Sequence, residues 1–147
     1  MAFIEITTDE IAKIVSGLNK KQNISNFKGM PNGLSFVFEK RILITNTQIP
    51  LKIEFRESVD NQIKFEVLTN SDNPMIIIAF ETIKNNVSVF IPQTLLTKGI
   101  TVENNYIIVN PSIIAKQKGF EINITEVSLI DVKMVLQFEI MEKASDK

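Results

Sequence analysis

The side chains in this sequence that could do acid-base chemistry are carboxylates and lysines, because its 147 residues include no His and no Cys. The lack of His removes the commonest general base, the commonest metal ligand and every Ser-His pair. The five glycines are scattered, so neither a phosphate-binding loop nor a dinucleotide fingerprint can be drawn. We therefore expect no catalytic residue, no metal site and no cofactor, and predict that the chain is not an enzyme.

Carboxylate pairs could still support glycosidase or acid-base chemistry. Asp9 and Glu10 are adjacent, but a capping box from Thr7 to Glu10 explains them, since Thr and Glu at this spacing satisfy each other's backbone N–H groups. Asp60 lies in a turn context, and Asp131 interrupts an apolar run as a bulge or turn residue would. An enzyme that uses only carboxylates or lysines is accordingly the third hypothesis.

The charge balance excludes one class of partner. Sixteen basic and 17 acidic residues leave a net charge of −1, which provides no field for binding nucleic acid. No apolar run approaches the roughly 20 residues of a membrane helix, so we expect no transmembrane segment. Met1 to Ile6 lacks the features of a secretory signal, which makes a soluble, cytoplasmic protein the default expectation and leaves the compartment open.

The elements that must position any site begin with a helix at about residues 8–19, where apolar residues repeat at helical spacing after the capping box. After the helix, apolar residues recur at every second position, which is the spacing of a β-strand. Strands are predicted at 34–38, 42–45, 49–55 and 63–67, and the last two form a hairpin around the turn at 58–62.

The segment 73–84 is ambiguous. Its Ile76 to Ile78 triplet favours a strand, whereas Asp72 or Asn73 followed by Pro74 favours a capped helix, and we prefer a helix at about 74–84. A strand at 87–91 and a helical turn or loop at 93–99 follow.

The second half continues with a hairpin around Asn104 and Asn105. Asn110 and Pro111 indicate a short helix at about 111–117, which Gly119 would close. From Phe120 to Ile140 apolar residues alternate with polar ones, and twice the apolar residues change between even-numbered and odd-numbered positions. These changes predict bulges or a tight turn near Glu126 and near Asp131.

These elements predict one α+β domain spanning residues 1–147. It comprises a curved, mainly antiparallel β-sheet, the N-terminal helix at about 8–19, and one or two short helices at about 74–84 and 111–117. The polar tail at 142–147 is expected to be frayed.

The remaining feature that could indicate a function is the apolar surface of the predicted strands. The strands carry long one-sided apolar faces, which either form only a core or, in a curved sheet, also line a groove for an acyl chain. The predicted lining consists of the bulky members of the strongest faces: Phe36, Phe38, Ile53, Phe55, Leu136 and Phe138.

The order of elements, with a capped N-terminal helix, an alternating antiparallel series, a middle helix and a long bent final stretch, resembles a single module of the tubular lipid-binding superfamily. That superfamily includes bactericidal/permeability-increasing-like and synaptotagmin-like mitochondrial lipid-binding domains, together with small bacterial proteins of similar build. The resemblance implies a curved sheet wrapped around a helix, with lipid carried in the seam. It transfers no functional residue.

Two non-enzymatic functions are therefore preferred to an enzymatic one. The leading hypothesis is a non-enzymatic binding module for an apolar or lipid-like ligand in a sheet-lined groove. The alternative is a structural or assembly protein that forms a homo-oligomer, or pairs with a protein partner, through apolar strand faces or edges.

Overall fold

The computed structural model describes residues 2–18, 23–42, 44–69, 71–85 and 99–141. The strand predicted at 87–91 and the tail at 142–147 lie outside these residues, as does all of the predicted loop at 93–99 except Gly99.

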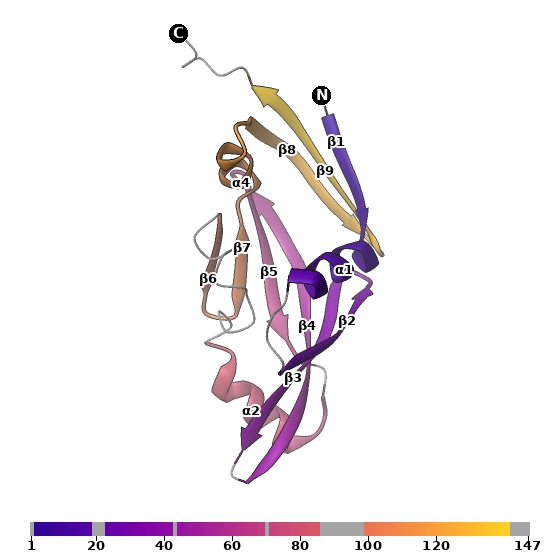
Figure 1. Cartoon of the computed structure of the whole chain (residues 1–147), viewed down its shortest axis with the longest axis vertical. Helices are drawn as coiled ribbons and strands as arrows, with labels where there is room; N and C mark the ends of the chain where they lie inside the picture. The colour runs from indigo at the N-terminus through magenta and orange to yellow at the C-terminus, as the bar shows by residue number, and fades with distance from the viewer. Residues whose placement is uncertain (1, 19–22, 43, 70, 86–98, 142–147) are drawn as a thin grey trace.

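The described residues form an α+β fold with mainly antiparallel, open and curved sheets and a helix near the N-terminus, which confirms the predicted fold class (Figure 1). The helices are α1 (Thr8–Leu18), α2 (Pro74–Ile83) and α4 (Pro111–Gln117). The strands are β1 (Ala2–Thr7), β2 (Ile24–Met30), β3 (Gly33–Ile42), β4 (Thr45–Val59), β5 (Gln62–Leu68), β6 (Ile100–Glu103), β7 (Tyr106–Val109), β8 (Glu121–Ile130) and β9 (Lys133–Met141).

The strands are divided between two sheets. The small sheet has the order β1-β9-β8, and the large sheet has the order β2-β3-β4-β5-β7-β6. The β8–β9 turn reaches α1 and the β2–β3 turn at one end, and the β4–β5 turn reaches β8 at the other (Figure 1). The two sheets therefore meet at both ends of β8 and are separate between them.

The start of α1 follows the predicted capping box. Glu10 N–H donates to Thr7 Oγ1 at 3.1 Å, and Thr7 N–H donates to Glu10 Oε1 at 3.0 Å. The Glu10 carboxylate accepts hydrogen bonds from Thr7 N–H and from the Thr7 hydroxyl, and these two bonds lower the pKa of the Glu10 carboxyl below its ordinary value of 4.5. Asp9 also has a structural partner, because its Oδ1 accepts a hydrogen bond from Gly29 N–H at 3.1 Å.

The ambiguous segment is a helix. Asn73 Oδ1 accepts from Met75 N–H at 2.9 Å, and Pro74 occupies the first helical position, where its missing N–H costs nothing. The same pattern starts α4, whose cap Asn110 accepts from Ile113 N–H at 3.2 Å. Gly119, with φ of 91°, closes α4 as predicted.

The predicted hairpins are confirmed. Asp60 and Asn61 form the two-residue turn between β4 and β5, and both have positive φ, as tight hairpin turns require. Asn104 has a φ of 55° in the turn between β6 and β7. The parity switch near Glu126 is a bulge in β8, and the switch at Asp131 is the β8–β9 turn.

Two details of the sequence-based prediction need correction. The strand expected at 42–45 does not exist separately, because β3 ends at Ile42 and β4 begins at Thr45. Strands β1 and β2 were not predicted. The bulge between Ser25 and Lys28 breaks the alternation in β2, and β1 is a short strand directly before the capping box.

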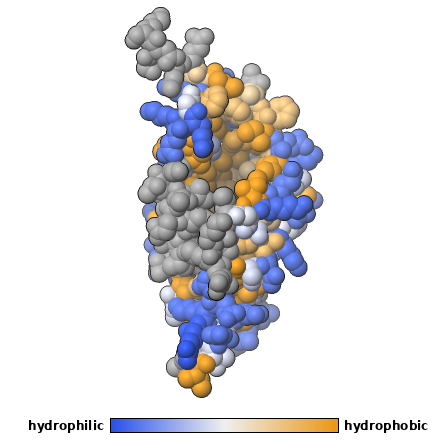
Figure 2. Space-filling model, in the orientation of Figure 1, coloured by the Kyte–Doolittle hydropathy of each residue, from blue (hydrophilic) through white to orange (hydrophobic). Residues whose placement is uncertain are grey.

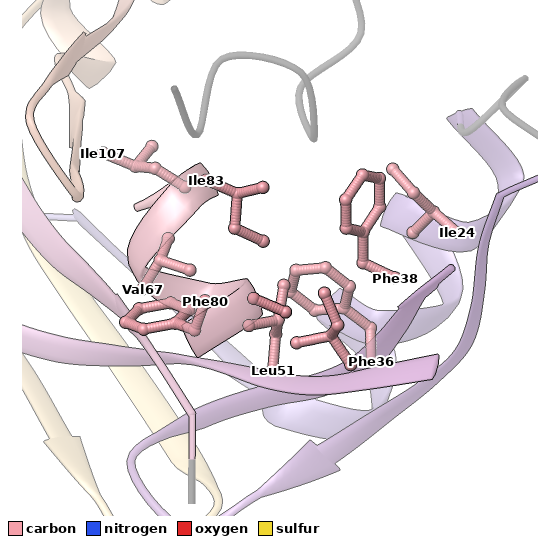
Figure 3. Packing of buried hydrophobic residues seen from close by; sticks show 10 residues of the cluster. Ile24, Phe36, Phe38, Leu51, Val67, Phe80, Ile83 and Ile107 are labelled. Carbon is pink, nitrogen blue, oxygen red and sulfur yellow. The ribbon is translucent and has the colours of Figure 1, made fainter. Parts of the chain in front are cut away.

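The core lies between α2 and one face of the large sheet (Figure 3). Alternate residues of β3, β4, β5 and β7 point to this face, because side chains along a strand alternate between its two sides. The buried cluster consists of Ile24, Phe36, Phe38, Ile49, Leu51, Val67, Ala79, Phe80, Ile83 and Ile107. This core accounts for the half of the large sheet that α2 covers.

Candidate functional site

The small sheet has one entirely apolar face. The register of its three strands places eleven apolar side chains on the same side, with no polar residue among them. They are Ala2, Ile4, Ile6, Ile122, Ile124, Val127, Leu129, Met134, Leu136, Phe138 and Ile140.

This face is not covered in the way a core is. Met134 is the only buried member of the eleven, the others are half-buried or exposed, and the Ile140 side chain is 66% exposed. A globular protein ordinarily buries an apolar face of this size, because roughly 25 cal/mol is gained for each Å² removed from water. Among the described residues this apolar face is therefore only partly covered, which is typical of a surface that binds another molecule.

The large sheet presents a second apolar surface to the same space. Phe55 and Phe65 are opposite each other on β4 and β5, and their rings meet edge to face with centroids 6.0 Å apart. A pocket of about 410 Å³ is lined by Phe55 from the large sheet and by Ile124 and Val127 from the apolar face of the small sheet. Figure 2 shows the surface hollowed between the two sheets, with hydrophobic residues on its walls. We call this hollow the inter-sheet cleft.

Two bulges shape the cleft. One interrupts β4 between Phe55 and Glu57, and the other interrupts β8 between Ile124 and Glu126. A bulge bends its strand and increases the local twist. Because residues of both bulges line the same pocket, the two sheets curve where the cleft is formed.

Polar contacts fix the two sheets at both ends of the cleft. At one end, Asn61 of the β4–β5 turn accepts a hydrogen bond from Ile124 N–H at 2.6 Å and donates to Asn123 Oδ1 at 3.3 Å. At the other end, the β8–β9 turn accepts hydrogen bonds from Thr8 N–H at 2.7 Å and from Asn32 N–H at 2.8 Å. Hydrogen bonds within the fold therefore connect the two sheets at both ends of the cleft.

The lining of the pocket is mostly polar. Besides its three apolar residues, it consists of Glu57, Ser58, Asp60, Asn61, Thr125 and Glu126. A ligand in this pocket would meet both apolar and polar side chains, as an amphiphile would require.

The six residues predicted from the sequence fall into three places. Phe36 and Phe38 are 2% and 7% exposed in the core beside α2, where Figure 3 shows them packed. Ile53 is half-buried and packs against that core. Only the other three lie on the faces that bound the cleft, Phe55 on the large sheet and Leu136 and Phe138 on the small sheet.

Sequence reasoning missed the contribution of β1 to the apolar face. Ala2, Ile4 and Ile6 alternate with Phe3 and Glu5, which is the period-two signal of a strand. The alternation of apolar residues in β8 was predicted correctly, but the predicted lining of the groove included no residue of β8.

Comparisons with known proteins identify no relative. No protein-family model, no curated protein and no solved structure matches this chain. Within the part of the chain that the structure describes, no group of three or more Asp or Glu side chains gathers where a metal ion could be held. No helix within the same residues is long and apolar enough to cross a membrane.

Proposed function

We propose that the protein is a non-enzymatic binding module that holds an apolar or lipid-like molecule in the inter-sheet cleft. The observation that carries this proposal is the eleven-residue apolar face of the small sheet, ten of whose members are not buried. A ligand lying against this face and against Phe55 would remove both apolar surfaces from water.

The size and form of the cleft support the same proposal. Its pocket of about 410 Å³ is within the range of roughly 300 to 1,000 Å³ that is usual for small-molecule sites. The hydrogen bonds that fix the sheets at both ends reduce the ordering cost of binding, because the site exists before the ligand arrives. The resemblance to tubular lipid-binding modules points the same way and stays a prediction.

Native mass spectrometry tests this proposal. The purified protein is soaked with a lipid extract and with oleic acid, and the wild-type protein is expected to retain one bound species. Leu136→Glu, which puts a charge on the apolar face, is expected to lose it. Gln137→Glu places the same side chain on the opposite face of β9 and should retain the ligand. Absence of any bound species in the wild type contradicts the proposal.

A second candidate function, self-association, is favoured by the free edge of β1. The other three sheet edges are protected: β2 is bulged and carries Lys28, β6 has four residues, and β8 is occupied by the contacts of Asn61 and Ser112. β1 has six residues with no bulge, Pro or Lys, and its Phe3 is 65% exposed.

The backbone pattern indicates how two copies would pair. Thr8 N–H bonds to Val132, so alternate residues Ile4 and Ile6 direct their backbone groups towards β9, while Phe3 and Glu5 direct theirs outwards. Antiparallel pairing of two β1 strands can then place Ile4 of both copies side by side on one continuous apolar face. Light scattering tests this: a dimer that Glu5→Pro converts to a monomer supports it, and a monomeric wild type excludes it.

A further inference from the structure

The turn between β3 and β4 ends in an exposed apolar side chain. Ile44 is 88% exposed, the highest value for any large hydrophobic residue among those the structure describes. The hollow between the sheets in Figure 2 lies towards one end of the long axis, and Figure 1 places this turn at the other end. Figure 2 shows hydrophobic atoms at the same end, with hydrophilic residues directly behind them.

Two cations lie behind Ile44 on the same hairpin. Lys40 is paired with Thr47 and Arg41 with Asn46, and residues 40–47 contain no acidic side chain. Among the described residues neither cation is in an ion pair, and Lys40 Nζ donates a long hydrogen bond of 3.4 Å to Thr82 Oγ1. Lys40 and Arg41 therefore place two positive charges near the hairpin turn, one on each face of β3, with Glu39 directly before them.

The neighbouring helix adds apolar surface at this end. α2 is apolar on both sides: Ala79, Phe80 and Ile83 are buried against the core, whereas the side chains of Met75 and Ile78 are exposed. The Lys40–Thr82 hydrogen bond ties this helix to the hairpin. The exposed residues of α2 also include Thr82 and Glu81, and the Glu81 carboxylate is paired with Lys84 at 2.8 Å, so the apolar part of this surface is at the N-terminal end of the helix.

We infer that the hairpin end, defined as Lys40, Arg41 and Ile44, together with the exposed Met75 and Ile78 of α2, docks the protein on an anionic membrane surface. Ile44 enters the interface between headgroups and acyl chains, and Lys40 and Arg41 meet the lipid headgroups. Apolar insertion and nearby cations both favour binding at an anionic bilayer, and each cation near the surface contributes roughly 1 kcal/mol. This inference goes beyond the proposed ligand site and uses different residues.

Vesicle flotation tests the inference with the full chain. Phosphatidylcholine vesicles are compared with vesicles containing about 30% phosphatidylglycerol, and binding is expected to the anionic vesicles and to weaken at about 0.5 M salt. Replacing each cation lowers partitioning about fivefold, so Lys40→Gln with Arg41→Gln lowers it about 25-fold. Ile44→Ser is expected to lower it about tenfold.

Ile130→Ser is the matched control. Ile130 is 76% exposed next to the β8–β9 turn and is followed by Asp131 instead of being preceded by cations. Its replacement should leave vesicle binding unchanged. Failure of the wild-type protein to float with anionic vesicles overturns the inference, as does an equal loss in Ile44→Ser and Ile130→Ser. Ile44→Ser should still bind oleic acid, so failure here is distinguishable from failure of the cleft proposal.

Discussion

At the scale of single residues, two glycines show how closely α1 is seated on the large sheet. A Cβ atom at Gly29 would overlap the backbone of Asp9 at the start of α1, whereas one at Gly17 would meet nothing within 4 Å. Gly29 also donates its N–H to Asp9, so this position joins β2 to the helix by close backbone approach.

Gly29→Ala is expected to lower the free energy of unfolding by about 1–3 kcal/mol, because the backbones must move apart. Gly17→Ala, within α1, is the matched control and should raise it by about 0.5–1 kcal/mol, since Ala is the better helix former. Urea denaturation measures both changes. Equal effects of the two substitutions would refute the close approach at Gly29.

The capping box gives a pH-dependent prediction. Because the pKa of Glu10 is lowered in the folded state, the stabilisation it contributes is present above its ordinary pKa of 4.5 and is lost as pH falls through the folded value. The wild-type protein should therefore be more stable than Glu10→Gln at neutral pH, and the difference should shrink below about pH 4. Thermal melts at several pH values measure it. A difference that grows on acidification would contradict the assignment.

At the scale of elements, local signals predicted most of the fold because the decisive interactions are short in sequence. The capping box and the Asn-Pro pairs at 73–74 and 110–111 fixed the starts of the helices, and Asp60 with Asn61 fixed a hairpin. The division into two sheets was not predictable, because it depends on pairing β1 with β9 across almost the whole chain.

One of the two attachments between the sheets depends on the β4–β5 turn, and it can be tested there. Asn61→Gly keeps the positive φ of 66° and removes both side-chain hydrogen bonds to β8. The amide hydrogen of Ile124 should then exchange faster, and stability should fall by about 1–2 kcal/mol. Asp60→Gly, at the preceding positive-φ position, is the control and should leave exchange at Ile124 unchanged.

At the scale of the whole molecule, the candidate site is a consequence of two apolar faces that border the same pocket. Period-two alternation shows that a strand has an apolar side but contains no information on what covers that side. Phe36 and Leu136 illustrate this, because both belong to strongly alternating strands, yet α2 covers the first and the second lies on the open face of the small sheet. The lining of the cleft therefore required the tertiary structure.

The overall arrangement also separates two tasks along the long axis. The cleft opens between the sheets, and the cationic hairpin with Ile44 lies towards the opposite end (Figures 1 and 2). Substitutions at the two ends should therefore act independently on ligand binding and on vesicle binding, because the sites share no residue.

The most direct test of ligand binding in the cleft uses the absence of Trp from the chain. Leu136→Trp and Gln137→Trp each introduce a single fluorophore, on opposite faces of β9. A dibrominated stearic acid, which quenches Trp on contact, is then titrated into each variant. The account predicts saturable quenching of Trp at position 136 and none at position 137. Equal quenching at both positions, or no quenching at position 136, would contradict it.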